Sequence, residues 1–208
     1  MRKILLLAAA LALTIGATAQ EKPFTYGLKA GINIAQISSG TVDNGIWGIL
    51  DFDALDMKIG FFVSGHVNYS FGQFFGIQPE LSFSMQGGKQ SWTDDLWGSG
   101  SSTLYLNYIN IPVLFEVKPI TNLSLFVGPQ IGFNIYKSAT TNTNGETIFR
   151  GNVNAKTIDF AAVVGLQYAI LGKYLISARY NIGFTSVFDD NISGRANRVI
   201  QIGVGYQF

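Results

Sequence analysis

The chain has 208 residues, no cysteine and a formal net charge of +1 at pH 7. The absence of cysteine excludes disulfides and thiolate metal sites, and the near-neutral charge gives no reason to expect a nucleic-acid partner. Hydrophobic residues make up 48% of the chain and charged residues only 13%, whereas soluble domains average about 25% charged residues.

The N-terminus has the three parts of an export signal peptide. Arg2 and Lys3 carry positive charge, residues 4–15 form a short apolar core, and Ala17-Thr18-Ala19 is a small-residue cleavage site. The apolar core is too short for a membrane-spanning helix, which needs about 20 residues.

We therefore predict a signal peptide over residues 1–19 that is cleaved after Ala19, followed by one domain over residues 20–208. An uncleaved signal anchor is the alternative. Loss of the two N-terminal cations would change the formal charge from +1 to −1.

Apolar residues alternate with small or polar residues along the rest of the chain, with a period of two. In residues 24–37, Tyr26, Leu28 and Ala30 fall on one face and Gly27 and Lys29 on the other. Such alternation is typical of a strand with one apolar face. It recurs in eight segments, which are residues 24–37, 57–69, 74–86, 103–118, 123–136, 156–170, 174–187 and 197–208.

Residues 103–118 are the least regular of these segments. Leu104 and Leu106 have the opposite parity to Ile109 and Ile111, so we expect a β-bulge near Tyr108 to restore the alternation. Three prolines within the segments, at positions 79, 112 and 129, lack the N–H that a regular ladder requires.

The connections between the eight segments alternate between long and short. Bacterial outer-membrane barrels pair long extracellular loops with short periplasmic turns in this way, and an open sheet edge is not viable in lipid. We predict an all-β, eight-stranded antiparallel up-and-down transmembrane β-barrel with both termini on the periplasmic side. A soluble barrel or sandwich is the alternative, but its outer face would be polar.

Aromatic residues gather near the predicted ends of the strands, where the membrane interfaces would lie. Tyr26, Tyr69 and Tyr174 are examples at the predicted periplasmic ends, and Trp92 and Trp97 fall in the outer loops. The loop aromatics, beside Asp94 and Asp95, are equally consistent with a recognition surface.

Three short motifs resemble known outer-membrane proteins. The final strand, ending in Tyr206-Gln207-Phe208, resembles the signal that the bacterial barrel-assembly machinery reads. Residues 108–115 (YINIPVLF) and residues 26–33 (YGLKAGIN) are similar to motifs of the Bacteroidota outer-membrane β-barrel family that includes the PorT-like proteins. The resemblance implies an outer-membrane location, outer-membrane lipid and the assembly machinery as partners, and a C-terminal assembly signal that includes Tyr206 and Phe208.

Ionisable residues are few on the polar face that would line the lumen. An eight-stranded barrel has an interior just wide enough for side chains to fill, and charges buried there must be paired. We predict an internal network centred on Glu80, Glu116 and Arg179 that plugs the lumen; a gated pore or a small-ligand pocket is the alternative. The residues expected in this network are Lys29, His66, Glu80, Glu116, Asp159 and Arg179.

The sequence predicts no catalytic, cofactor or metal site. His66 is the only histidine, and a hydrogen-bonding role in the lumen is a simpler interpretation than a catalytic pair with Ser64. Asp51, Asp53 and Asp56 lack the glycine and the distant glutamate of a calcium-binding loop.

We therefore expect a non-enzymatic barrel with a structural or surface-interaction role through its outer loops, where an extracellular ligand or protein could bind. A narrow pore or a secretion or assembly component is the alternative, and an outer-membrane enzyme is a third.

Overall fold

The computed structural model describes residues 23–43, 49–94, 98–188 and 195–208. The predicted signal peptide lies outside these residues, as do Trp97 and Asp95. Among the described residues, no helix has both the length and the apolar character needed to cross a membrane.

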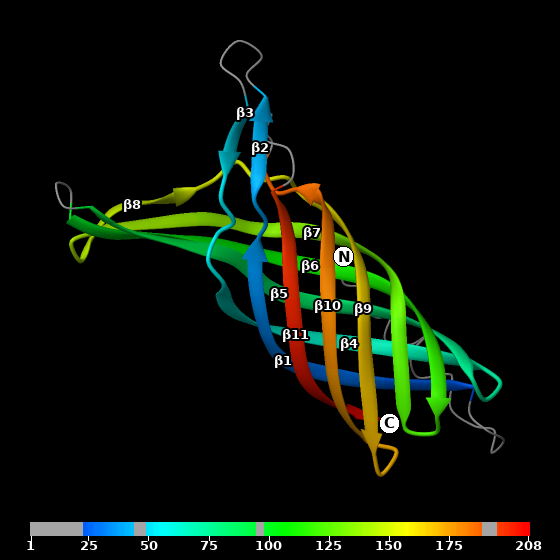
Figure 1. Ribbon diagram of the computed structural model, residues 1–208. Coiled ribbons are helices and arrows are strands. Elements are labelled where there is room, and N and C mark those ends of the chain that lie inside the picture. Colours follow the sequence, from blue (N-terminus) through cyan, green and yellow to red (C-terminus); the bar gives the residue numbers. More distant parts are fainter. Residues whose placement is uncertain (1–22, 44–48, 95–97, 189–194) are drawn as a thin grey trace, which may run out of the picture.

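Eight antiparallel strands form a closed ring (Figure 1). Each strand pairs with its neighbour in the chain, and the first pairs with the last in a register that runs from Gly27 opposite Gln207 to Ile37 opposite Asn197. This ring confirms the predicted eight-stranded up-and-down barrel. Its strands are β1 (Phe24–Ile37), β4 (Lys58–Phe71), β5 (Phe75–Asp94), β6 (Gly98–Ile120), β7 (Leu123–Thr143), β9 (Ile158–Ile170), β10 (Tyr174–Ser186) and β11 (Ala196–Gln207).

The strands are strongly tilted, as the stagger of the ladder shows. A path that starts at Asp159 on β9 and steps from each inward residue to its cross-strand partner goes once around the ring. It comes back to β9 at Ala169 and not at Asp159. The residues along it are Gly132, Asn110, Ser82, Ser64, Lys29, Gly205 and Leu175. Tilt and stagger fix the width of a barrel with a given strand number, and eight strands leave room only for side chains.

The two faces of the wall differ as the alternation predicts. Outward side chains such as Ile59, Phe61 and Val63 are exposed, whereas inward residues such as Lys29 and Asn33 are buried. Since the outer face is apolar and the inner face polar, hydrocarbon is the solvent that suits the outside of this barrel.

Strand β6 corrects one expectation from the sequence. A register shift does lie between Asn107 and Tyr108, but it occurs against β7, where Ile135 is the extra residue. Strand β6 itself keeps its alternation, so that Leu104, Leu106 and Tyr108 all point inward and are buried. The apolar residues upstream of Tyr108 therefore face the lumen, and the inferred change of parity is wrong.

The three prolines lie within the strands, and cross-strand pairing is interrupted beside each of them. Between β4 and β5, for example, the pairing stops at His66–Glu80 and resumes at Tyr69–Ile77, on either side of Pro79. The barrel tolerates these gaps because the ladder continues above and below each of them.

Three strands continue well beyond their predicted ends. Strands β5, β6 and β7 extend past residues 86, 103 and 136, and β8 (Glu146–Asn152) adds a fourth strand beside β7 (Figure 1). A tight turn at Asn144-Gly145, both with positive φ, joins β7 to β8. A separate hairpin of β2 (Gly40–Asp43) and β3 (Ile49–Phe52) rises from the same end.

Closure of the ring can be tested with engineered cysteines, since the native chain has none. Ala30 and Val204 are direct outward-facing partners across the β1–β11 seam. We expect the A30C/V204C variant to form a disulfide on oxidation, because such partners lie within about 5.5 Å. Non-reducing electrophoresis and intact mass measure the product.

The matched control places the second cysteine one strand further away. Ile176 is the partner of Val204 on β10, so an A30C/I176C pair would be separated by two strand spacings, about 10 Å. Equal cross-linking of both pairs would contradict the closed ring.

Candidate functional site in the barrel lumen

A buried carboxylate ties three strands together in the middle of the lumen. Glu80 on β5 accepts hydrogen bonds from Lys29 Nζ of β1 at 2.6 Å and from both terminal nitrogens of Arg179 of β10 at 2.6 Å. The side chains of all three residues are almost fully buried. The bidentate contact fixes the guanidinium in one plane and spans the lumen from β10 to β5.

Hydrogen bonds connect this cluster to a second carboxylate. Gln78 Nε2 donates to Glu80 Oε1 at 2.5 Å, and Asn68 Nδ2 lies 3.3 Å from Gln78 Oε1 and 2.7 Å from Glu116 Oε2. Lys118 also lies 3.3 Å from that oxygen of Glu116. Thus Glu116 joins the network through two amides and has no direct contact with Arg179.

His66 and Asp159 are placed differently from the other predicted members. His66 is the cross-strand partner of Glu80, yet neither ring nitrogen has a hydrogen-bond partner among the described residues. Its ring instead fills the space beside Gly27, where an added Cβ would lie 2.6 Å from His66 Cε1. Asp159 forms no ion pair with any residue in the described part of the chain.

An apolar layer closes the lumen at the end of the barrel where the long connections lie. Its buried members come from four parts of the chain and are Ile37, Leu104, Leu106, Tyr108, Ala155 and Val187. We call this group the apolar cap. Leu55 and Phe188 pack against it, and backbone bridges Asp56–Lys89 and Ala155–Phe188 hold the flanking segments in place.

Tyr108 joins the cap to the polar lumen below it. The ring belongs to the cap, while the hydroxyl lies 3.0 Å from Asn197 Nδ2 on β11. Because β6 and β11 are not neighbours in the ring, this side chain crosses the lumen. Sequence reasoning missed the cap, although unbroken parity through Leu104 and Leu106 would have placed these residues inside.

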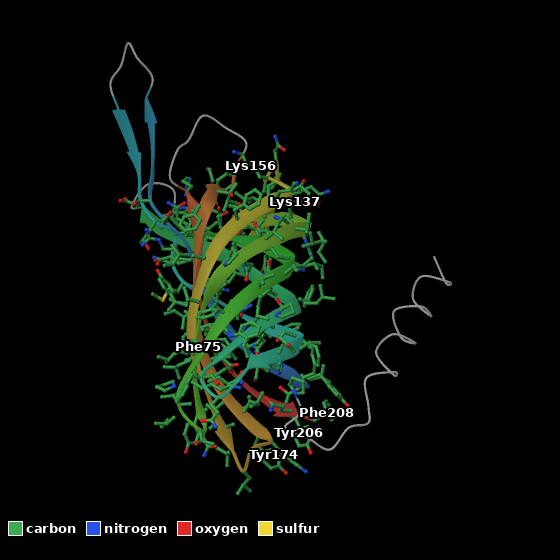
Figure 2. All side chains as sticks on the ribbon, turned by 90° about the vertical axis from the view of Figure 1, so that its right-hand side faces the viewer. Phe75, Lys137, Lys156, Tyr174, Tyr206 and Phe208 are labelled. Atoms are coloured by element: carbon green, nitrogen blue, oxygen red, sulfur yellow. The ribbon has the colours of Figure 1, made fainter. Side chains whose placement is uncertain are left out.

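The predicted C-terminal signal residues lie in an aromatic cluster at the end opposite the cap. Phe208 stacks on Tyr26 with ring centroids 5.4 Å apart, and Tyr206 contacts Phe208 at 5.1 Å and Tyr174 at 5.6 Å. Figure 2 shows Tyr174, Tyr206 and Phe208 at one end of the barrel and Lys137 and Lys156 at the other. This distribution fits an aromatic belt at a membrane interface.

No group of three or more His, Asp or Glu side chains that could hold a metal ion occurs in the described residues. Asp53 and Asp56 are exposed in the segment after β3. Trp92 lies against the backbone of Gly100, with its Nε1 2.8 Å from the position that a Cβ would take there.

The contribution of the Glu80 cluster to the stability of the barrel can be measured with the E80Q variant. Glu80 is the only carboxylate among the described residues that Lys29 and Arg179 contact directly, so this change leaves two buried cations without a counter-charge. We expect the free energy of unfolding to fall by about 3–5 kcal/mol, measured by urea unfolding of the refolded barrel. The control E146Q alters an exposed carboxylate on β8 and should leave stability unchanged. Equal stability of E80Q and the wild type would contradict a structural role for the cluster.

The chain matches the family model described as "Outer membrane protein beta-barrel domain" over residues 18–189. Several solved structures are similar at low identity. Ail, the attachment invasion locus protein of Yersinia pestis, is 17% identical over 86% of this chain and 98% of its own, with a TM-score of 0.44. Neisserial surface protein A is 14% identical over 88% and 95%, with a TM-score of 0.46, and OprG of Pseudomonas aeruginosa is 10% identical over 88% and 95%, with a TM-score of 0.42. No curated protein matches the sequence. The family match covers most of the chain, and the protein therefore belongs to the outer-membrane β-barrel domain family of the bacterial outer membrane.

Proposed function

We propose that this protein is a non-conducting outer-membrane barrel that acts through the part of its sheet outside the membrane. The filled lumen is the observation that carries the proposal. From the Glu80 cluster, through the Tyr108 side chain, to the apolar cap, buried side chains occupy successive levels of the interior. A barrel of eight strands leaves little space beyond that filling.

The extended strands provide the surface for interaction. Strands β5 to β8 form a sheet beyond the cap, and β8 pairs only on its β7 side in the described chain. Ile148 and Phe149 on β8 are 65% and 49% exposed, and Trp92 on β5 is also exposed. Exposed aromatic and aliphatic side chains on a rigid support are suitable anchors for an extracellular ligand or protein.

We further propose that the barrel carries no enzyme activity. Ser64 Oγ and both ring nitrogens of His66 have no hydrogen-bond partner among the described residues, so the two side chains do not form a nucleophile–base pair. Both are buried in the lumen.

The motifs at residues 26–33 and 108–115 support a place in the Bacteroidota branch of the family, with its PorT-like members. A secretion or assembly component and a narrow pore are the alternative functions within this proposal. The same proposal includes export with cleavage after Ala19 and contact of the apolar wall with lipid. It also includes insertion by the barrel-assembly machinery, which would read the final strand with Tyr206 and Phe208 as its signal.

Planar bilayer recordings test the non-conducting barrel. The purified wild-type protein should insert without producing stable conductance steps, because the side chains of the Glu80 cluster and of the apolar cap occupy the lumen. A large porin in the same bilayers shows that the assay detects channels. Reproducible steps from the wild type that change size in the Y108A variant would overturn the proposal in favour of a pore.

Export and sidedness can be tested together on intact cells. An epitope tag inserted between Asn144 and Gly145, in the β7–β8 turn, should bind antibody without permeabilisation. The matched tag in the β4–β5 turn at Gly72 should bind only after permeabilisation, and the intact mass of the extracted protein should correspond to a chain that starts at Gln20. Labelling of the Gly72 tag on intact cells would contradict this orientation.

A further inference from the structure

The outer face of the barrel has a gap at Gly65, in the middle of β4. This residue faces outward, since Ser64 and His66 on either side of it are buried in the lumen. Its cross-strand partners are Leu28 on β1 and Leu81 on β5, whose side chains are 57% and 58% exposed. The row Leu28–Gly65–Leu81 therefore leaves a slot one side chain wide between two leucines whose strands lie about 10 Å apart.

Packing within the described chain does not require a glycine at position 65. A Cβ atom built on the inward glycines Gly27 and Gly205 would lie 2.5 Å from a backbone oxygen of the adjacent strand, so a side chain there would clash. On Gly65 the nearest contact would be Leu28 Cδ2 at 3.6 Å, which is an ordinary separation. Glycine weakens the interior of a strand, and it often marks a site where a ligand approaches the backbone closely.

The slot over Gly65 is part of a groove of about 520 Å³, a volume within the range of about 300–1,000 Å³ that is usual for small-molecule sites. The register places residues of β1 on one side of the slot and residues of β5 on the other. The groove is lined mainly by apolar side chains, which include those of Tyr26, Leu28, Val67, Pro79, Leu81 and Phe208.

The position of the groove indicates what fills it. It is continuous with the exposed apolar wall, to which Ile32 and Phe61 belong, and it ends at the stacked rings of Tyr26 and Phe208. Hydrocarbon chains are the solvent of such a wall. Because these chains are as apolar as leucine, van der Waals contact decides where they rest, and a chain in the slot has protein atoms below it and on both sides.

We propose that this groove holds one fatty acyl chain of a phospholipid, which lies along β4 over Gly65 and between Leu28 and Leu81. The inference rests on the proposed contact of the apolar wall with lipid and adds a defined site for a single chain. The groove lies in the half of the wall nearest the β4–β5 turn. In the orientation proposed above, this half faces the periplasmic leaflet, which consists of phospholipid, and the headgroup lies beside the rings of Tyr26 and Phe208.

The experiment refolds the barrel into vesicles of phosphatidylethanolamine and phosphatidylglycerol, extracts it in a mild detergent and measures its intact mass under native conditions. The wild type should retain one phospholipid per barrel. The G65L variant fills the slot with a side chain like those of its two neighbours, which the open space allows, so it should fold and lose the retained lipid.

The matched control V164L enlarges an exposed apolar side chain on β9, which does not line the groove, and should retain the lipid as the wild type does. Equal retention by the wild type and G65L, or an inserted wild type that retains no lipid, would overturn the site while leaving the general lipid contact intact. A wild-type dimer that G65L disrupts would assign the groove to a second copy of the chain instead. Barrels that do not float with the vesicles would contradict the proposed lipid contact itself, and the acyl-chain site with it.

Discussion

The whole structure depends on one constraint, which is that every backbone N–H and C=O within hydrocarbon needs a partner from the chain itself. An unpaired group there costs several kcal/mol, so the sheet has no edge to leave open. The pairing of β1 with β11 meets this constraint, and it also fixes the stagger that returns the ladder from Asp159 to Ala169. Closure thereby sets the width of the lumen, and the width decides which inward side chains meet.

A narrow, closed lumen imposes its own condition on the residues inside. Lys29 and Arg179 share the carboxylate of Glu80, and Gln78 and Asn68 extend the network to Glu116, so each charge of this network lies next to a polar partner. A buried pair of this kind adds less to stability than the attraction suggests, because both partners lose their hydration. The cluster is better understood as a filling that occupies the lumen and holds strands from opposite sides of the ring in register.

The sequence predicted the barrel well where lipid dictates the pattern. Strand β1 has the predicted bounds, residues 24–37, because its exposed apolar residues alternate with inward residues along most of its length. Strands β5 to β7 were predicted too short, because outside lipid both faces of a strand can be polar and the period disappears. The contact of Glu80 with Arg179 joins residues on strands far apart around the ring, so it follows from the stagger, which no single strand encodes. Asp159 was expected in that network, but the same stagger places it nearer the cap.

The apolar cap and the charged cluster place Asp159 in an unusual position between them. The outer face of the wall is apolar, the cap lies between this level and the outer end of the barrel, and the two buried cations of the cluster already pair with Glu80. Electrostatic interactions strengthen where water is excluded, so a carboxylate at this level has more to gain from a counter-ion than one on the surface. The cost of burying this carboxylate therefore arises from the closed, narrow barrel itself, since an open or wider lumen would let water solvate it.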